Sequence, residues 1–232
     1  MDIPIILPAT AANVVEEFLA CVESAAKLQK NGISIAPSML IYGSPGVGKS
    51  ETAKYISAKL GLPLLTARTD SLISSYLGNT SKNLRLVFEY AAKSPCVLFL
   101  DEFDAIAKQR DDSQELGELK RVVIGLLQNL DVWGKDTILI AATNHEHLLD
   151  PAIWRRFAFK LQLPLPARSE RSQMIKVFLG DYKIEEPKLR RVVEMTEGMS
   201  GSELRDICHT VIRHAVLKDR REIDFYDFYI GK

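Results

Sequence analysis

Short, almost continuous apolar runs recur along the first part of the chain. Three of them, Ser38–Tyr42, Cys96–Leu100 and Thr137–Ala142, are typical of strands buried on both faces of a parallel sheet. A fourth strand is expected at Leu62–Thr66. Helical spacing of apolar residues occurs at Asn13–Lys30, Glu51–Leu60, Ser81–Lys93 and Leu116–Leu130. Alternating strands and helices predict an α/β domain whose parallel sheet is the middle of three layers.

The pattern changes after Leu163–Pro166. Helical spacing recurs at Ser169–Leu179, Pro187–Met195 and Ser202–Lys218, and no buried strand is expected among them. We therefore predict a large α/β domain over residues 1–166, including an N-terminal helix at 13–30. A small helical lid domain is predicted over residues 167–232.

A glycine-rich motif, GSPGVGKS at Gly43–Ser50, stands between the first expected strand and a helix, and it matches G-x-x-x-x-G-K-[ST]. Gly46 and Gly48 allow backbone N–H groups to turn toward phosphate oxygens, at the positive end of the following helix. Lys49 is expected to reach the β- and γ-phosphates, and the Ser50 hydroxyl to bind Mg²⁺. The candidate nucleotide-binding residues here are Gly43, Pro45, Gly46, Val47, Gly48, Lys49, Ser50 and Glu51.

Two carboxylates and an amide follow the other buried strands. Asp101 ends the run at Cys96–Leu100, which we expect to neighbour the strand before the glycine-rich motif, and it is the second candidate ligand for Mg²⁺. Glu102 comes next and is suited to polarise an attacking water. Asn144 follows the third buried run and is a candidate to hydrogen-bond that water, although Thr-Asn is also a common exit from a strand. Together these residues predict magnesium-dependent ATP hydrolysis.

Charge and composition narrow the functional classes. Lys+Arg and Asp+Glu both total 30 in 232 residues, and this balance argues against nucleic-acid binding as the main function. Three widely separated cysteines form neither a disulfide framework nor a metal motif, and the four histidines lack metal-ligand spacing. No run approaches the roughly 20 apolar residues that span a bilayer, so we expect no transmembrane segment and a cytoplasmic location.

The order of these parts resembles the AAA+ ATPases, specifically the AAA clade that includes katanin, spastin and the ATPase domains fused to membrane metalloproteases. The segments that carry the resemblance are SMLIYGSPGVGKS, VLFLDEFDAIAKQR, ILIAATNHEHLLDPAIWRRF and GMSGSELRDIC. It implies an ATP- and Mg²⁺-dependent enzyme with a P-loop NTPase fold. It also implies a homo-oligomer, a hexamer on ATP binding, that acts on protein substrates.

The resemblance assigns further roles. Asn144 matches the first sensor, and Arg155 and Arg156 match the arginine fingers that reach into a neighbouring subunit's ATP. Gly201 and Ser202 match the second sensor region, near adenine and ribose; the role of Arg205 stays open. In addition, Tyr76, Leu77 and Gly78 resemble a first pore loop that grips a polypeptide, and Ala107–Leu119 falls where a second would lie.

The chain departs from the clade in places. Ile3–Pro8 cannot be matched to the clade's adenine-side loop, and the two arginines are adjacent rather than spaced by Pro-Gly. No HExxH protease motif is present. Residues 1–12 leave no space for a substrate-recognition domain, so recognition is expected to come from an adaptor or partner chain, or from a further domain.

Our leading hypothesis is a ring-forming motor that remodels, unfolds or translocates proteins through a central pore. Two alternatives remain: a nucleic-acid-handling AAA+ protein of the loader or initiator type, and a regulatory scaffold switched by ATP binding without turnover. The intact Glu102 counts against the scaffold.

Overall fold

The computed structural model describes residues 5–33, 36–69, 77–107, 125 and 137–229. The chain forms two compact units. One comprises Thr10–Gly43 and Lys49–Gln162, and the other comprises Met1–Ala9, Ser44–Gly48 and Leu163–Lys232.

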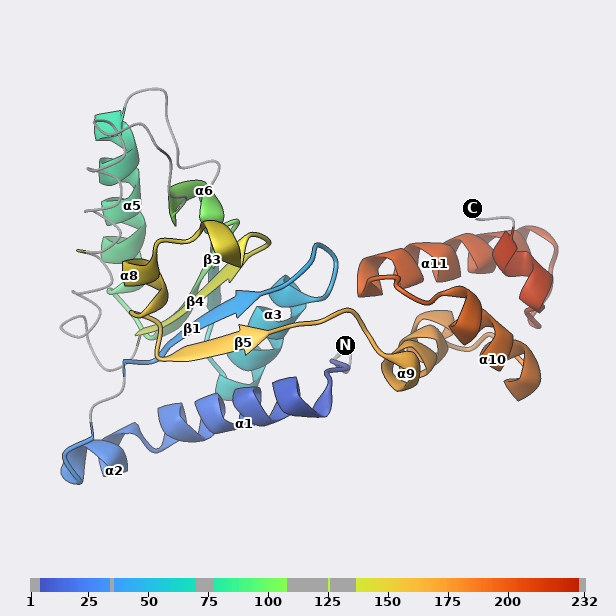
Figure 1. The fold of residues 1–232 in the computed structure, drawn as a ribbon, viewed down its shortest axis with the longest axis horizontal. Helices are drawn as coiled ribbons and strands as arrows, with labels where there is room; N and C mark the ends of the chain where they lie inside the picture. Colours follow the sequence, from blue (N-terminus) through green and yellow to red (C-terminus); the bar gives the residue numbers. More distant parts are fainter. Residues whose placement is uncertain (1–4, 34–35, 70–76, 108–124, 126–136, 230–232) are drawn as a thin grey trace. The chain divides into compact units, whose positions relative to one another are not determined.

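A five-stranded parallel sheet forms the centre of the first unit (Figure 1). Its strands are β1 (Ser38–Tyr42), β2 (Leu64–Arg68), β3 (Cys96–Asp101), β4 (Thr137–Thr143) and β5 (Phe159–Gln162). Their order across the sheet is β2-β3-β4-β1-β5. The expected α/β fold with a parallel sheet is confirmed, and β5 is a strand that the apolar pattern did not predict.

One expectation about the sheet is wrong. We expected the strand that ends in Asp101 to neighbour the strand before the glycine-rich motif, but β4 lies between β3 and β1. Tyr42 at the end of β1 pairs with Thr143 at the end of β4. The residue that leaves the adjacent strand is therefore Asn144.

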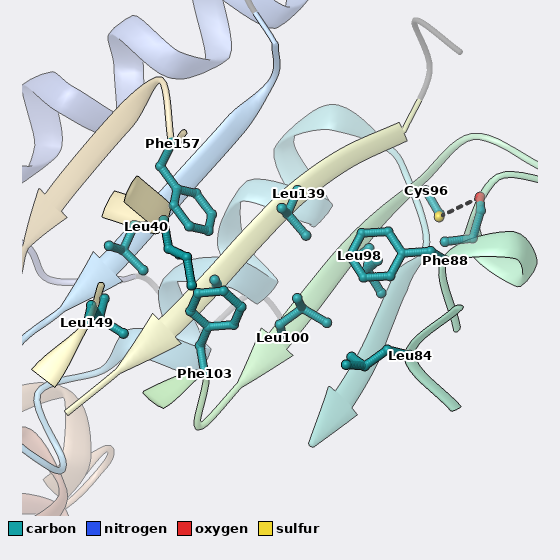
Figure 2. Close-up of a cluster of buried hydrophobic side chains, with 13 residues drawn as sticks. Leu40, Leu84, Phe88, Cys96, Leu98, Leu100, Phe103, Leu139, Leu149 and Phe157 are labelled. Atoms are coloured by element: carbon teal, nitrogen blue, oxygen red, sulfur yellow. Dashed lines mark hydrogen bonds between the residues drawn. The ribbon is translucent and has the colours of Figure 1, made fainter. Parts of the chain in front are cut away.

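Alternate residues of the strands face two different helical layers. Leu40, Leu98 and Leu139 contribute to a cluster beneath α5 (Leu77–Ala91) and α8 (Pro151–Trp154), as Figure 2 shows in part. On the other face lie α1 (Ala9–Glu23) and α3 (Lys49–Leu60) (Figure 1). There the rings of Phe18 and Phe159 meet edge to face, with centroids 5.2 Å apart. Burial on both faces explains why the central strands read as unbroken apolar runs.

The second unit is helical in its C-terminal part. It contains α9 (Arg168–Leu179), α10 (Glu186–Met195), α11 (Gly201–Leu217) and the short 3₁₀ helix η2 (Phe225–Tyr229). Their apolar faces share one core, to which Ile175, Leu189, Leu204 and Phe228 belong. The predicted helical C-terminal segment is confirmed, while the boundary at residues 166 and 167 stays a prediction.

Other element boundaries differ from the expected ones. Instead of one helix over 13–30 there are two, because the chain leaves α1 at Ser24 and restarts as α2 (Ala25–Lys30). β2 begins two residues later than expected, after Pro63. Helix α6 (Asp104–Ala107) and the 3₁₀ helix η1 (Glu146–Leu148) were not predicted. The helix expected at Leu116–Leu130 lies outside the described residues except for residue 125.

No helix among the described residues is long and apolar enough to cross a membrane.

Candidate nucleotide site

The glycine-rich motif forms the connection between β1 and α3. Gly46 and Gly48 have φ angles of 77° and 102°, a region that side-chain-bearing residues rarely occupy. Helix α3 begins at Lys49, so the positive dipole end of a twelve-residue helix follows directly. The backbone has the form that binds phosphate groups in helix-terminal sites.

Lys49 contacts two segments that are far apart in the sequence. Its side chain is largely buried, with 9% of the residue exposed. The ammonium Nζ donates to the Gly43 carbonyl at 2.7 Å and to Asn144 Oδ1 at 2.5 Å. Burial lowers the pKa of Lys49, and the nearby carboxylates of Asp101, Glu146 and Asp104 oppose that shift. The carboxylates thus favour the charged form of Lys49 despite its burial, and a charged lysine at the phosphate loop can bind an anionic ligand.

The Asp101 carboxylate is held at the carboxyl end of β3. Its Oδ2 accepts from the Ser50 hydroxyl at 3.2 Å, and its Oδ1 accepts from the Glu102 N–H at 3.0 Å. A hydroxyl and a carboxylate oxygen therefore lie side by side, and both are hard oxygen ligands of the kind Mg²⁺ prefers. Because Mg²⁺ usually keeps waters and takes only one or two protein ligands beside phosphates, this pair fits the ion.

Glu102 has an unusual backbone conformation. Its φ of 54° is in the left-handed region, which costs energy for a residue with a side chain. The Thr69 hydroxyl lies 3.0 Å from the Asp101 carbonyl and 2.5 Å from that of Glu102, and so supports this turn. The Glu102 carboxylate lies 3.5 Å from Arg68 Nη2, with both side chains about half exposed.

Sequence reasoning did not identify Arg68 or Thr69 as part of this region. A polar pair at the end of an expected strand was the available signal, but the boundary predicted for β2 stopped at Thr66, before both residues. Asp104 and Thr143 were missed as well; both are buried, and the Thr143 hydroxyl donates to Asp104 Oδ1 at 3.0 Å.

Arg155 and Arg156 lie in the turn between α8 and β5. They follow α8, whose first turn is capped by Asp150 accepting from the Ala152 N–H at 2.6 Å. Their neighbours Ile153 and Phe157 are buried, whereas both arginines are exposed. Among the described residues, neither guanidinium has an acidic partner.

The two arginines precede β5, which begins at Phe159 opposite Met39 near the start of β1. Figure 1 accordingly shows α8 beside the start of β5, whereas α3 follows the end of β1. The structure thus brings Lys49, Ser50, Asp101 and Asn144 together, whereas the arginine pair lies in the turn before β5.

Gly201 and Ser202 lie with Gly46 in the second unit. Ser200 caps α11, and its side chain and Glu203 form a reciprocal capping box. The Ser202 N–H donates to the Gly46 carbonyl at 3.0 Å. A Cβ on Gly201 would lie 3.3 Å from that carbonyl oxygen, which makes a small residue the best fit there.

The other residues predicted for the phosphate loop and the pore loop differ in exposure and in secondary structure. Pro45 is exposed, Val47 is buried, and the exposed Glu51 carboxylate pairs with Lys54 at 2.8 Å. Leu77 and Gly78 form the first turn of α5 instead of a loop. Tyr76 lies outside the described residues, as does all of the segment at 107–119 except Ala107, which ends α6.

Comparison with known proteins identifies the family. Residues 39–165 match the ATPase family associated with various cellular activities (AAA). An uncharacterized AAA family ATPase of Sinorhizobium fredii, y4kL, is 40% identical over 225 residues, which is 94% of this chain and 67% of that protein. The proteasome-activating nucleotidase of Methanococcus maripaludis is 32% identical over 207 residues, 86% of this chain and 51% of its own length.

The 26S proteasome regulatory subunit 10B homolog A of Arabidopsis thaliana is also 32% identical over 207 residues, covering 85% of this chain and 51% of that protein. The chain thus spans about half the length of these proteasome-related relatives. With the family match, the parallel sheet and the phosphate-loop geometry in agreement, the chain belongs to the AAA family and is a nucleotide-binding ATPase.

Proposed function

We propose that this chain is the ATP-hydrolysing part of a ring-forming motor that remodels, unfolds or translocates protein substrates. The observation that carries the proposal is the exposure of Arg155 and Arg156, which precede β5 and have no acidic partner among the described residues, whereas Lys49 follows the end of β1. A protomer with a phosphate-binding lysine and two exposed guanidinium groups that find no acidic partner in the described part of the chain is suited to complete its neighbour's site. Repetition of that contact closes a ring, which we propose is a hexamer.

At the phosphate loop, the backbone N–H groups and Lys49 bind the phosphates of ATP. Ser50 and Asp101 would hold Mg²⁺, which when bound neutralises charge on the phosphates. Glu102 orients the attacking water and accepts its proton, and Asn144 hydrogen-bonds the same water. The Asn144 amide oxygen is 2.5 Å from the Lys49 ammonium, so the residue proposed to contact water lies beside the residue proposed to contact phosphate.

Arg155 and Arg156 act on the ATP of the next subunit. A guanidinium beside the γ-phosphate offsets charge that develops during hydrolysis, an effect of about 10³- to 10⁵-fold where arginine fingers are measured. Their exposure and the absence of acidic partners in the described part of the chain leave them available for that contact. The buried Ile153 and Phe157 on either side fix the backbone that carries them.

Protein substrates would be gripped by Tyr76, Leu77 and Gly78, with recognition supplied by an adaptor or partner chain. The names of the proteasome-activating nucleotidase and the 26S proteasome subunit support a role in protein handling. We further propose that Gly201 and Ser202 lie near the adenine and ribose, and that residues 167–232 form the lid domain. The zero net charge argues against the nucleic-acid alternative.

A complementation experiment tests the proposal. One variant carries Lys49→Ala and keeps its arginines; the other carries Arg155→Ala with Arg156→Ala and keeps its phosphate loop. Each alone should hydrolyse ATP poorly, and their mixture should recover activity because the first supplies arginines to the second. A mixture of Lys49→Ala with Arg213→Ala, an exposed arginine on α11, controls for dilution of active subunits.

The assembly is measured directly with Glu102→Gln and ATP, by native mass spectrometry. A six-membered ring together with recovered activity supports the motor. A monomer under these conditions, with no recovery on mixing, excludes it. Salt-sensitive DNA binding would favour the nucleic-acid alternative, and normal function of Glu102→Gln would favour the ATP-switched scaffold.

A further inference from the structure

A buried carboxylate lies beside the phosphate-binding lysine without belonging to the expected machinery. Asp104 opens α6, three residues after Asp101, and only 8% of it is exposed. A buried charge is costly unless hydrogen bonds satisfy it. One of its oxygens, Oδ1, accepts from the Thr143 hydroxyl at 3.0 Å, across the ends of β3 and β4.

The Thr143 hydroxyl both donates and accepts a hydrogen bond. While Oγ1 donates to Asp104, it also accepts from the backbone N–H of His145 at 3.0 Å. Thr143 is 1% exposed and is the last residue of β4, so its side chain is firmly packed. A hydroxyl that accepts from the N–H two residues later closes a local turn. The residue enclosed by that turn is Asn144.

The turn decides where the Asn144 amide points. Asn144 Oδ1 is 2.5 Å from Lys49 Nζ, and the segment after it leaves the sheet for η1. Without the Thr143 hydroxyl, the peptide at 144–145 would lose its anchor to the strand end. Asp104 then acts on Asn144 indirectly, because its carboxylate fixes the rotamer of the Thr143 hydroxyl.

A simpler explanation is that this pair only joins β3 to β4. That junction already has a backbone hydrogen bond, from the Phe103 N–H to the Ala142 carbonyl at 2.8 Å, and the two strands are paired along their length. The side-chain pair adds little to strand pairing. Its further contribution is the hydrogen bond that Thr143 Oγ1 accepts from the His145 N–H, on the other side of Asn144 in the chain.

We propose that Asp104 and Thr143 are positioning residues that hold the Asn144 amide against the phosphate-binding lysine and, during hydrolysis, against the attacking water. This inference rests on the proposed role of Asn144 in hydrolysis. It adds two residues to the machinery that have no contact of their own with water or phosphate in the proposed reaction.

Thr143→Val tests the inference because valine has nearly the same shape and lacks the hydroxyl. We expect kcat to fall by up to about 100-fold, the size of loss that a small misplacement can cause, with the Kd for ATP unchanged. Thr143→Ser, which keeps the hydroxyl, should restore kcat. An equal loss in Thr143→Ser would contradict the positioning role.

The nucleotide-free protein gives an independent readout. Amide hydrogen exchange at His145 should speed up in Thr143→Val and stay slow in Thr143→Ser, since only the valine variant removes the acceptor. Unchanged exchange at His145 in a folded Thr143→Val protein would overturn the inference.

A double-mutant cycle with Asn144→Ala separates this inference from the proposed function. If Thr143 acts through Asn144, adding Thr143→Val to Asn144→Ala should cause no further loss of kcat. If the loss of kcat in the double variant equals the product of the two single losses, the positioning role of Thr143 is overturned while the role of Asn144 stands. An unchanged kcat in Asn144→Ala itself would overturn the role of Asn144, and this inference with it.

If Thr143→Val does not fold, variants of Asp104 provide a second test of the inference. Asp104→Asn keeps an oxygen that can accept from the Thr143 hydroxyl, whereas Asp104→Leu removes the acceptor at similar volume. We expect near-normal kcat in the first and the Thr143→Val loss in the second. Equal activity of the two variants would contradict the inference.

Discussion

The Asn144 amide oxygen lies 2.5 Å from the Lys49 ammonium, although 95 residues separate the two in the chain. The contact exists because β4 lies beside β1, so that the ends of both strands reach the same edge of the sheet. It joins the phosphate loop to the strand end that we propose positions the attacking water.

Replacing Lys49 by Met should weaken ATP binding strongly while keeping the volume of the side chain. A hydrogen bond to a charged group contributes about 1.5–3 kcal/mol, which corresponds to roughly 10- to 100-fold in Kd. Equilibrium binding of a fluorescent ATP analogue measures the change. Lys54→Met is the matched control, since Lys54 is exposed and pairs with Glu51 in an i,i+3 contact. Equal affinities of the two variants would contradict the role of Lys49.

Glu102→Gln should separate binding from hydrolysis. Glutamine keeps the shape and the hydrogen-bonding capacity but cannot accept a proton from water, so we expect kcat to fall by about 10²- to 10⁴-fold. ATP affinity should be retained. Glu89→Gln, at an exposed site on α5 that pairs with Arg85, should hydrolyse ATP normally. Steady-state rates beside binding isotherms distinguish the cases, and wild-type kcat in Glu102→Gln would exclude Glu102 as the base.

Arg68→Ala should raise basal ATP hydrolysis slightly. Arg68 Nη2 lies 3.5 Å from the Glu102 carboxylate, where it would compete with the attacking water for that group. The pair is about half exposed, and exposed ion pairs contribute at most about 1 kcal/mol, so the rise should not exceed about fivefold. The initial rate at saturating ATP measures it. A tenfold fall would show instead that Arg68 supports the reaction.

Gly46→Ala should destabilise the protein more than Gly32→Ala. Both glycines have nearly the same φ, 77° and 76°, so each alanine has a similar backbone penalty, about 1–2 kcal/mol. A Cβ on Gly32 meets nothing within 4 Å. A Cβ on Gly46 would collide with Ser202 Oγ and lie 2.7 Å from Ser200 Oγ, disturbing the cap of α11. Thermal unfolding of both variants gives the comparison; equal shifts in Tm would show that the serines move away without cost.

Cys208 should resist alkylation until the protein unfolds. Burial raises the pKa of its thiol to about 12, so the reactive thiolate is absent at pH 8. Cys21 is partly exposed and serves as the internal control in a mass-spectrometric labelling experiment.

The same shift predicts a loss of stability in alkali. The folded pKa is raised, so the stabilising contribution is complete below the ordinary thiol pKa of about 9. It declines as the pH rises toward the folded value of about 12. Rapid labelling of Cys208 in the native protein at pH 8 would contradict both expectations.

Much of the fold could be predicted from the sequence because its signals are local. The central strands are buried on both faces, and Cys96–Leu100 and Thr137–Ala142 therefore carry unbroken apolar runs within a residue of β3 and β4. The phosphate loop depends on glycine at particular backbone positions, and Gly43–Ser50 shows that requirement directly. The helices of the C-terminal segment were placed within one residue because each has an amphipathic pattern of its own.

Only the tertiary structure decided which strand ends meet. Parallel buried strands have similar compositions, so no local pattern shows that β4 lies between β3 and β1 and places Asn144 beside Lys49. The pairing of β5 with β1 likewise decides that Arg155 precedes a strand start, whereas the phosphate loop follows a strand end. The bond between Asp104 and Thr143 depends on the same packing. The sequence by itself determined which groups can bind phosphate; long-range packing of the sheet decided which of them act together.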